Sequence, residues 1–119
     1  MNPTVKAQWL EALRSGSLQQ GEGWLQRGDA YCCLGVLCEV AVQAMVIAPA
    51  RDVDGVMHYE TKSTSLPDLV FNWAGLPEGN QWSSASDNFK LHVQDKLIEL
   101  NDVDGASFDE IADWIEENL

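Results

Sequence analysis

The sequence predicts a mostly helical α+β fold, with about five helices around a buried, cysteine-rich central helix and a small β-hairpin or two-stranded sheet. The run at 31–38 (YCCLGVLC) is the most apolar stretch of the chain. Apolar residues at helical spacing occur near both ends, and a short alternating segment lies between them. The 119 residues are enough for one core, so we expect a single domain over 1–119.

The first predicted helix begins close to the N-terminus. Asn2 can accept hydrogen bonds from the free amides of a first turn, and Pro3 suits the first helical position. The Ser15-Gly16 pair ends the pattern. The apolar positions that share one face of this helix are Val5, Trp9, Ala12 and Leu13.

A glycine-rich segment at 18–30 predicts a loop or a short irregular hairpin. Gly21-Glu22-Gly23 matches the start of a dinucleotide-binding fingerprint. However, Gln26 stands where the third glycine of that motif belongs, and no strand is predicted before it. We therefore reject the motif.

The central helix is predicted from Cys32 to Gln43. At a helical turn of about 100° per residue, only a narrow stripe around Cys32, Glu39 and Gln43 is polar, so almost the whole circumference should be buried. Gly35 inside this helix would cost about 1 kcal/mol relative to alanine unless close packing offsets the loss. We therefore expect another element to cross the helix at Gly35.

The middle of the chain is less regular. The segment 49–66 has the pattern of a turn, one strand and a loop. Pro67 then suits the first position of a short third helix, and Gly75 is a typical stop for it. Residues 76–80 are rich in turn formers and predict a connector.

Two helices are predicted in the last third. At 89–100 a strand-like alternation competes with helical spacing, and we favour a helix that begins at Phe89 or Val93. The last helix has the clearest start in the chain, because Ser107 and Glu110 form the sequence pattern of a capping box.

The charge is strongly negative, since 19 acidic residues against 7 basic ones give −12. Such a surface repels phosphate backbones and anionic lipids, which disfavours direct nucleic-acid binding and docking on membranes. Neither a signal peptide nor a membrane-spanning run is recognisable. An odd number of cysteines without a secretion signal predicts free thiols and a cytoplasmic protein.

The three cysteines suggest two kinds of chemistry. On a helix, Cys32, Cys33 and Cys38 point in different directions and cannot converge on one zinc ion, so we expect neither a metal nor another cofactor. A Cys-dependent enzyme stays open as an alternative. In it, Cys32 or Cys33 at a helix start would pair with His58 or His92.

Acidic residues dominate the C-terminal quarter, where no Lys or Arg follows Lys96. The simplest interpretation is a solubilising face. The functional interpretation is a docking surface for a basic protein partner. The carboxylates that would form this surface are Asp102, Asp104, Asp109, Asp113, Glu116 and Glu117.

A second functional alternative is a small-molecule binder that sequesters a nucleotide signal. In that hypothesis Trp24 and Trp82 provide stacking surfaces, and Arg27 provides a cation near the glycine-rich loop. The scarcity of basic residues weighs against phosphate recognition.

Several short motifs are spread over most of the chain. They are WLEALRSG at 9–16, QGxG at 20–23, YCCLGVLC at 31–38, WAGL at 73–76, LND at 100–102 and SFxEIAD at 107–113. In this order they resemble a group of small uncharacterised proteins encoded by tailed phages and prophages. The group has no established activity, so the resemblance implies no catalytic residue. It implies a phage or prophage accessory protein in the host bacterial cytoplasm.

Together, the charge and this resemblance predict a non-enzymatic protein that binds and modulates a host protein, in host takeover or counter-defence. The expected partner has a basic surface. The sequence leaves the oligomeric state open.

Overall fold

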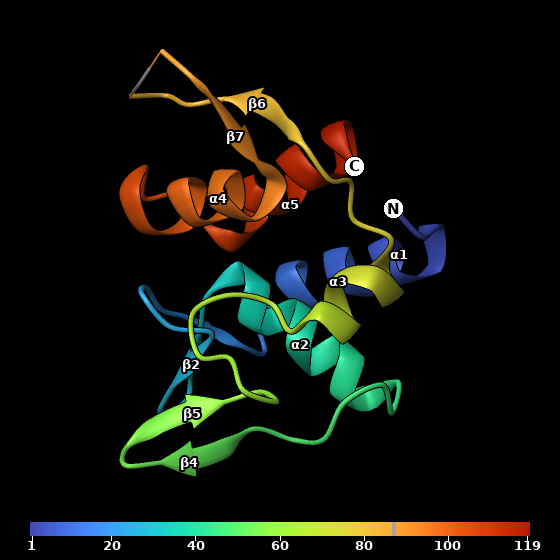
Figure 1. Cartoon of the computed structure of the whole chain (residues 1–119), viewed down its shortest axis with the longest axis vertical. Coiled ribbons are helices and arrows are strands. Elements are labelled where there is room, and N and C mark those ends of the chain that lie inside the picture. The colour runs from blue at the N-terminus through green and yellow to red at the C-terminus, as the bar shows by residue number, and fades with distance from the viewer. Residues whose placement is uncertain (87) are drawn as a thin grey trace.

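The mostly helical α+β fold class is confirmed by the computed structural model, which describes residues 1–86 and 88–119. Within these residues the chain forms five α-helices and seven short strands (Figure 1). A π-helical turn, η1 (Glu99–Val103), continues directly from the fourth helix. The α-helices are α1 (Pro3–Arg14), α2 (Cys33–Gln43), α3 (Asp68–Ala74), α4 (Val93–Ile98) and α5 (Phe108–Asn118).

The strands form three small sheets, which is more β-structure than the one hairpin or two-stranded sheet that the sequence predicts. In the first sheet the order is β1-β3-β2, with β1 parallel and β2 antiparallel to β3. The other two sheets are antiparallel pairs, β4 with β5 and β6 with β7. The strands are β1 (Gln19–Gln20), β2 (Gln26–Arg27), β3 (Ala30–Tyr31), β4 (Arg51–Val53), β5 (Val56–His58), β6 (Asn80–Ser83) and β7 (Lys90–His92).

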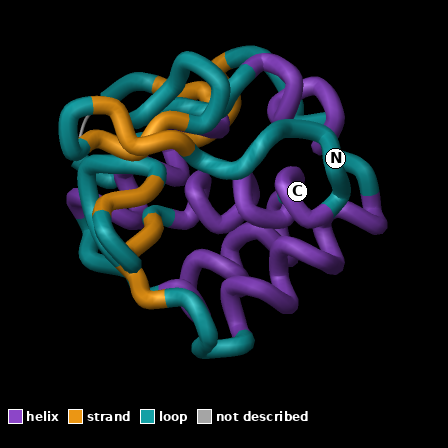
Figure 2. The backbone as a smooth tube through the Cα atoms, turned by 90° about the horizontal axis from the view of Figure 1, so that it is seen from below, coloured by secondary structure: helices purple, strands orange, loops and turns teal. Residues whose placement is uncertain are grey.

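The helices occupy the middle of the molecule, between strands at its two ends. Figure 1 places the β6–β7 pair at one end and the β4–β5 pair, with β2 beside it, at the other. Figure 2 shows the strands gathered towards one side and most helices on the opposite side. The two termini lie near each other in both views. The Lys6 ammonium donates to the main-chain carbonyl of Glu116 at 3.0 Å, which is consistent with this proximity.

The helix ends follow local sequence signals. The Asn2 side chain accepts from the amides of Thr4 and Val5 at 2.9 and 3.2 Å, as predicted for the cap of α1. The predicted capping box of α5 is formed, with reciprocal bonds between Ser107 and Glu110. Both starts are therefore confirmed.

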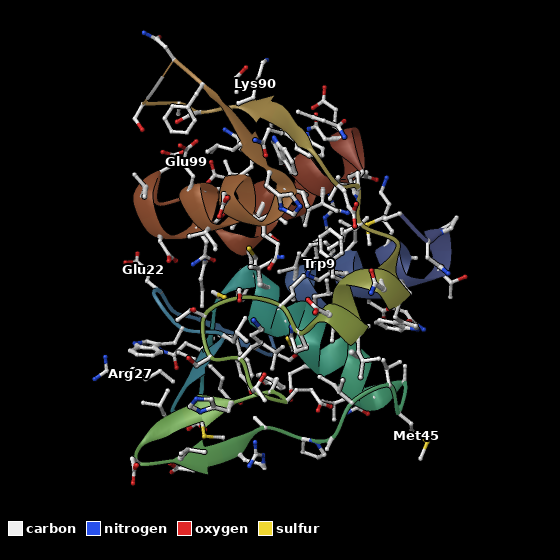
Figure 3. All side chains as sticks on the ribbon, in the orientation of Figure 1. Trp9, Glu22, Arg27, Met45, Lys90 and Glu99 are labelled. Carbon is white, nitrogen blue, oxygen red and sulfur yellow. The ribbon has the colours of Figure 1, made fainter. Side chains whose placement is uncertain are left out.

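The central helix α2 is buried as predicted. Eight of its eleven residues are buried, and Trp9 of α1 lies against it, fully covered, donating its indole N–H to the Cys33 carbonyl at 3.0 Å. Figure 3 shows Trp9 in the interior between the helices. The crossing element at Gly35 is the backbone of Leu25, so the predicted close contact is confirmed.

Residues 89–100 adopt both conformations that compete in the sequence. Lys90–His92 is strand β7, and α4 begins at Val93, with the His92 side chain accepting from the Gln94 amide. The strand partner, β6, lies partly in a segment that was predicted as a connector. Cys32, predicted as the first residue of the central helix, is its extended N-cap instead.

Candidate functional site

Four exposed carboxylates of α5 form what we call the acidic surface, namely Asp109, Asp113, Glu116 and Glu117. Arg14 of α1 reaches two of them. Its Nη2 atom lies 2.8 Å from Asp113 Oδ1 and 2.8 Å from Glu116 Oε2. The Arg14, Asp113 and Glu116 side chains are 36%, 76% and 61% exposed, so solvent screens both ion pairs and they add little to stability.

The other half of the acidic surface is not neutralised in this way. Across residues 1–86 and 88–119, neither Asp109 nor Glu117 makes an ion pair. Asp109 lies in the first turn of α5, where the helix dipole favours a carboxylate, whereas Glu117 lies in the last turn, where the dipole disfavours it. The negative charge of Glu117 is therefore not explained by the stability of its own helix.

Asp102 and Asp104 lie apart from the acidic surface, at the π-helical turn. Asp102 is half-buried, and its two oxygens accept from Asn101 Nδ2 at 2.8 Å and from the Gly23 amide at 3.2 Å. It therefore anchors the glycine-rich loop. Asp104 is exposed and caps the end of η1.

The aromatic residues proposed for small-molecule binding do not form one site. Trp24 and Arg27 line a common hollow with the turn between β4 and β5. Trp82 lies on β6, where its ring packs on Trp114 of α5 with the ring centroids 6.0 Å apart. Strands β2 and β6 are at opposite ends of the molecule (Figure 1). The structure therefore does not bring Trp24 and Trp82 together in one site.

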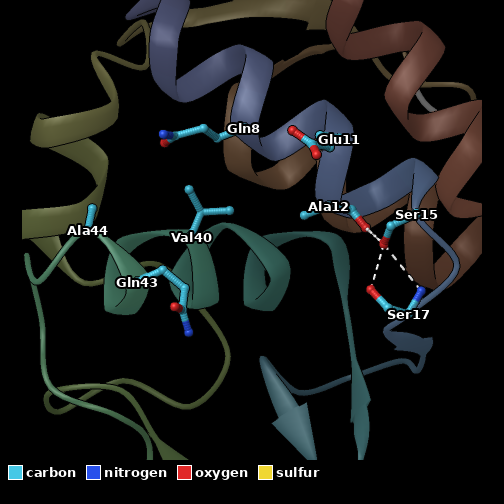
Figure 4. A pocket seen from close by; sticks show the side chains of 8 residues that line it. All are labelled: Gln8, Glu11, Ala12, Ser15, Ser17, Val40, Gln43 and Ala44. Carbon is cyan, nitrogen blue, oxygen red and sulfur yellow. Dashed lines mark hydrogen bonds between the residues drawn. The ribbon is translucent and has the colours of Figure 1, made fainter.

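A groove of about 430 Å³ runs between α1 and α2 (Figure 4). Ala12 and Val40 give it an apolar floor, and Glu11 adds a carboxylate to its α1 side. At one end the Ser15 hydroxyl lies 2.7 Å from that of Ser17. The sequence gives no signal for this groove, because its walls come from two helices that are distant in the chain.

A buried amide connects three parts of the chain. Asn101 is 1% exposed, and its Oδ1 accepts from Gln20 Nε2 at 3.0 Å and from the Cys33 amide at 3.2 Å. Its Nδ2 donates to the Gly21 carbonyl at 2.8 Å and to Asp102. Asn101 thus supplies the cap of α2 that the Cys32 side chain does not provide.

Four of the six sequence motifs meet at this amide and its partner Gln20. Gln20 also donates to the Ala106 carbonyl at 2.9 Å and accepts from the Phe108 amide at 3.0 Å, at the start of α5. Thus the QGxG, YCCLGVLC, LND and SFxEIAD motifs share one hydrogen-bond network. Sequence reasoning missed the role of Asn101, and the LND motif was the signal that could have indicated it.

The thiols are part of the core. Cys32 is 5% exposed, and Cys33 and Cys38 are fully buried. Burial raises the pKa of Cys32 to about 11 and raises the pKa of Cys33 and Cys38 well above that of an ordinary thiol. Because the thiolate is the reactive form, this environment suppresses nucleophilic chemistry at all three sulfurs.

The two histidines are engaged away from the thiols. His92 stacks on Phe71, with ring centroids 5.5 Å apart, and its Nδ1 accepts from the Gln94 amide. His58 Nδ1 lies 3.0 Å from the Val56 carbonyl on its own strand. The structure therefore does not bring together the Cys–His pair that the enzyme alternative requires.

Comparison with known proteins places the chain in a family. The model of a domain of unknown function, DUF8296, matches residues 1–119. The chain belongs to the DUF8296 family. No curated protein and no solved structure matches this DUF8296 chain.

Neither a metal-ligand cluster nor a membrane-spanning helix occurs in the described part of the DUF8296 chain. In residues 1–86 and 88–119, no group of three or more His, Cys, Asp or Glu side chains is arranged to hold a metal ion. None of the helices described is both long and apolar enough to cross a membrane.

A second polar cluster of the DUF8296 chain holds the β6–β7 region to η1. Glu99 Oε2 accepts from the Ser84 hydroxyl at 2.6 Å, and Oε1 accepts from the Ala85 amide at 2.9 Å. Lys96 Nζ lies 3.1 Å from Oε1 and also donates to the Ser83 carbonyl at 2.9 Å. Figure 3 shows Glu99 near the β6–β7 end and Arg27 near the opposite end.

Glu99 should make the stability of this DUF8296 protein depend measurably on pH. The hydrogen bond from Ser84, followed by those from Ala85 and Lys96, lowers the pKa of Glu99 to about 2. In an unfolded chain the pKa of Glu is about 4.3. Since the folded pKa is the lower one, the stability from this carboxylate is present above about pH 4.3 and is lost as the pH falls towards about 2.

We therefore expect the free energy of unfolding to fall more steeply between about pH 5 and about pH 2.5 in the wild type than in Glu99→Gln. Urea denaturation at constant ionic strength measures both slopes. The variant keeps the shape of the side chain and removes its charge. Equal slopes would therefore show that ionisation of Glu99 does not contribute to the free energy of unfolding.

Proposed function

We propose that this DUF8296 protein is a non-enzymatic phage or prophage accessory protein that binds and modulates a host protein in the bacterial cytoplasm. The phage context is supported by the resemblance of the sequence motifs, and the binding role by the charge of the molecule. The partner presents a basic surface to the acidic surface of α5.

The observation that carries this proposal is the incomplete neutralisation of the acidic surface. Arg14 compensates Asp113 and Glu116, while Asp109 and Glu117 face solvent without an ion pair in the part of the chain that the structure describes. The whole chain carries a net charge of −12, so its long-range field attracts cationic proteins. Complementary charge of this kind increases the rate of association and selects the partner.

The buried thiols favour binding over catalysis. Their raised pKa values and the separate contacts of His58 and His92 remove the nucleophile–base pair suggested by the sequence. The α1–α2 groove adds a concave surface with an apolar floor of Ala12 and Val40 and polar side chains at its edges. A concave surface of this mixed character fits protein recognition.

Charge reversal tests the proposal. The immobilised wild type, exposed to host-cell lysate, should retain a specific basic protein at about 0.1 M salt and release that protein at about 1 M salt. The electrostatic screening length falls from about 10 Å to about 3 Å between these two concentrations. Asp109→Lys combined with Glu117→Lys should abolish retention of that protein.

The matched control is Glu22→Lys combined with Glu60→Lys, which changes the net charge equally at exposed positions outside α5. It should retain the same protein. Thermal unfolding of both double variants checks that they are folded. Equal retention by the two variants would contradict a role for the acidic surface, and recovery of no specific protein at low salt would contradict the binding function.

A further inference from the structure

A hollow of about 270 Å³ lies between the glycine-rich region and the β4–β5 hairpin. Trp24 and Arg27 line it from one side, and Asp54, Gly55 and Val56 line it from the hairpin turn. These two segments are separated by the whole of α2, and the packing of β2 beside β5 brings them together. The hollow therefore combines an aromatic ring, a cation and a carboxylate.

The three side chains that could bind a ligand in this hollow have no partner among the described residues. Among residues 1–86 and 88–119, the side chains of Trp24, Arg27 and Asp54 make neither a hydrogen bond nor an ion pair. Arg27 and Asp54 carry opposite charges and face the same hollow, yet they do not pair with each other. This arrangement leaves room for a ligand between them.

The wall that carries Trp24 and Arg27 is held in place. Leu25, between them, is fully buried against Gly35, and its amide donates to the Ser63 carbonyl at 2.8 Å. The next residue, Gln26, has its Oε1 atom 3.0 Å from the Tyr59 hydroxyl. The close contact between Gly35 and the Leu25 backbone thus fixes strand β2, which carries Arg27.

The opposite wall is also ordered. Asp52 Oδ1 accepts from the Gly55 amide at 2.8 Å, and Asp54 adopts a left-handed conformation with φ 53°. Asp is among the few residues that tolerate this conformation, which closes the tight turn between β4 and β5. A site with two fixed walls loses little entropy when a ligand binds.

The three side chains define the chemistry of a ligand. Trp24 offers a flat face for stacking, Arg27 requires a hydrogen-bond acceptor, and Asp54 requires a donor. Phosphate groups are disfavoured by Asp54 and by the net charge of −12. The ligand should therefore be a flat ring, neutral overall, that presents acceptors on one edge and donors on another.

Guanine meets these requirements. Its O6 and N7 atoms accept from an arginine guanidinium, and its N–H groups can donate to a carboxylate while the ring stacks on an aromatic side chain. We propose that this hollow binds a neutral nucleobase with the guanine pattern of donors and acceptors, as the free base or the nucleoside. Trp24 stacks on the ring, Arg27 binds its O6/N7 edge, and Asp54 binds its N–H edge.

This hollow is formed by Trp24, Arg27 and the β4–β5 turn, whereas the acidic surface lies on α5, so variants that alter one leave the residues of the other unchanged. It also differs from a nucleotide site, because it needs neither a phosphate nor Trp82. The two properties can therefore be tested one at a time.

Titration of the ¹⁵N-labelled full chain with guanosine tests the proposal by NMR. The indole N–H of Trp24 should shift in a saturable way. Adenosine should bind more weakly, because it presents an N6–H₂ donor where guanine has the O6 acceptor. Trp24→Ala, Arg27→Gln and Asp54→Asn should each weaken guanosine binding by about tenfold or more. Asn also tolerates positive φ, so Asp54→Asn leaves the turn intact. Trp82→Phe is the matched control and should bind normally.

Several outcomes would overturn the proposal. They are the lack of a saturable shift at millimolar guanosine, and unchanged affinity in both Arg27→Gln and Asp54→Asn. Markedly tighter binding of guanosine monophosphate than of guanosine would show phosphate recognition instead. Tighter binding of L-tryptophan than of guanosine in the same hollow would assign the site to zwitterionic amino acids.

Discussion

Replacing Gly35 with alanine should lower the free energy of unfolding by at least about 2–3 kcal/mol. A Cβ atom at this position would overlap the carbonyl oxygen of Leu25 and lie 2.7 Å from its carbonyl carbon. Both atoms belong to the backbone of a segment that is itself held by hydrogen bonds to Ser63 and Cys32, so it cannot move aside cheaply.

The sign of the stability change in Gly35→Ala shows whether close packing or helix propensity dominates at this position. In an ordinary helix, Gly to Ala would raise the stability by about 1 kcal/mol. Urea denaturation followed by circular dichroism measures the change. Adding Leu25→Ala to Gly35→Ala should not restore stability, because the overlap is with the main chain. A Gly35→Ala variant as stable as the wild type would contradict the close contact.

Replacing Asn101 with leucine should destabilise the protein by about 3–5 kcal/mol. The leucine has a similar size but cannot bond to the Cys33 amide or the Gly21 carbonyl, and it also removes one bond each from Gln20 and Asp102. The loss leaves polar groups unsatisfied where water does not reach, which is more costly than the loss of an exposed hydrogen bond.

The matched control is Asn118→Leu. Asn118 also donates from its side-chain amide, to the Trp114 carbonyl at 2.9 Å, but it is exposed at the end of α5. Its replacement should change the stability by no more than about 0.5 kcal/mol. Urea denaturation midpoints measure the change in stability of both variants. Similar small losses in the two would show that the Asn101 network does not hold the motifs together.

The features that could be predicted from the sequence are those with a local cause. Asn2 with Pro3, and Ser107 with Glu110, place hydrogen-bonding groups within one turn of the amides that they cap. The burial of α2 follows from its composition, since few of its residues are polar. The contact at Gly35 was predicted because a glycine inside a helix needs a packing reason.

The features that were missed depend on contacts between distant segments. The π-helical turn η1 places Glu99 against Ser84 and Ala85, and Asn101 against Gln20 and Cys33. The LND motif marks this segment as special, but it does not identify these distant partners. The parallel pairing of the two-residue strands β1 and β3 is similarly set by tertiary packing and not by strand propensity.

The candidate sites were only partly predictable, because they also depend on contacts between distant segments. Charge counting identified an acidic C-terminal quarter, but it could not show that Arg14 partly neutralises α5 or that Asp102 holds Gly23. Trp24 and Arg27 are close in sequence and do share a hollow. The turn that completes it comes from 54–56, in a segment that carries none of the sequence motifs.

We infer that the cysteine run forms the core and that the molecule acts through its surface. Alkylation of the native protein with iodoacetamide at about pH 8, followed by mass spectrometry, tests it most directly. We predict that Cys32, Cys33 and Cys38 stay unmodified until denaturant unfolds the chain, because they are buried and their pKa values are raised. Rapid modification of any one of them in the folded protein would contradict the claim and favour a Cys-dependent enzyme.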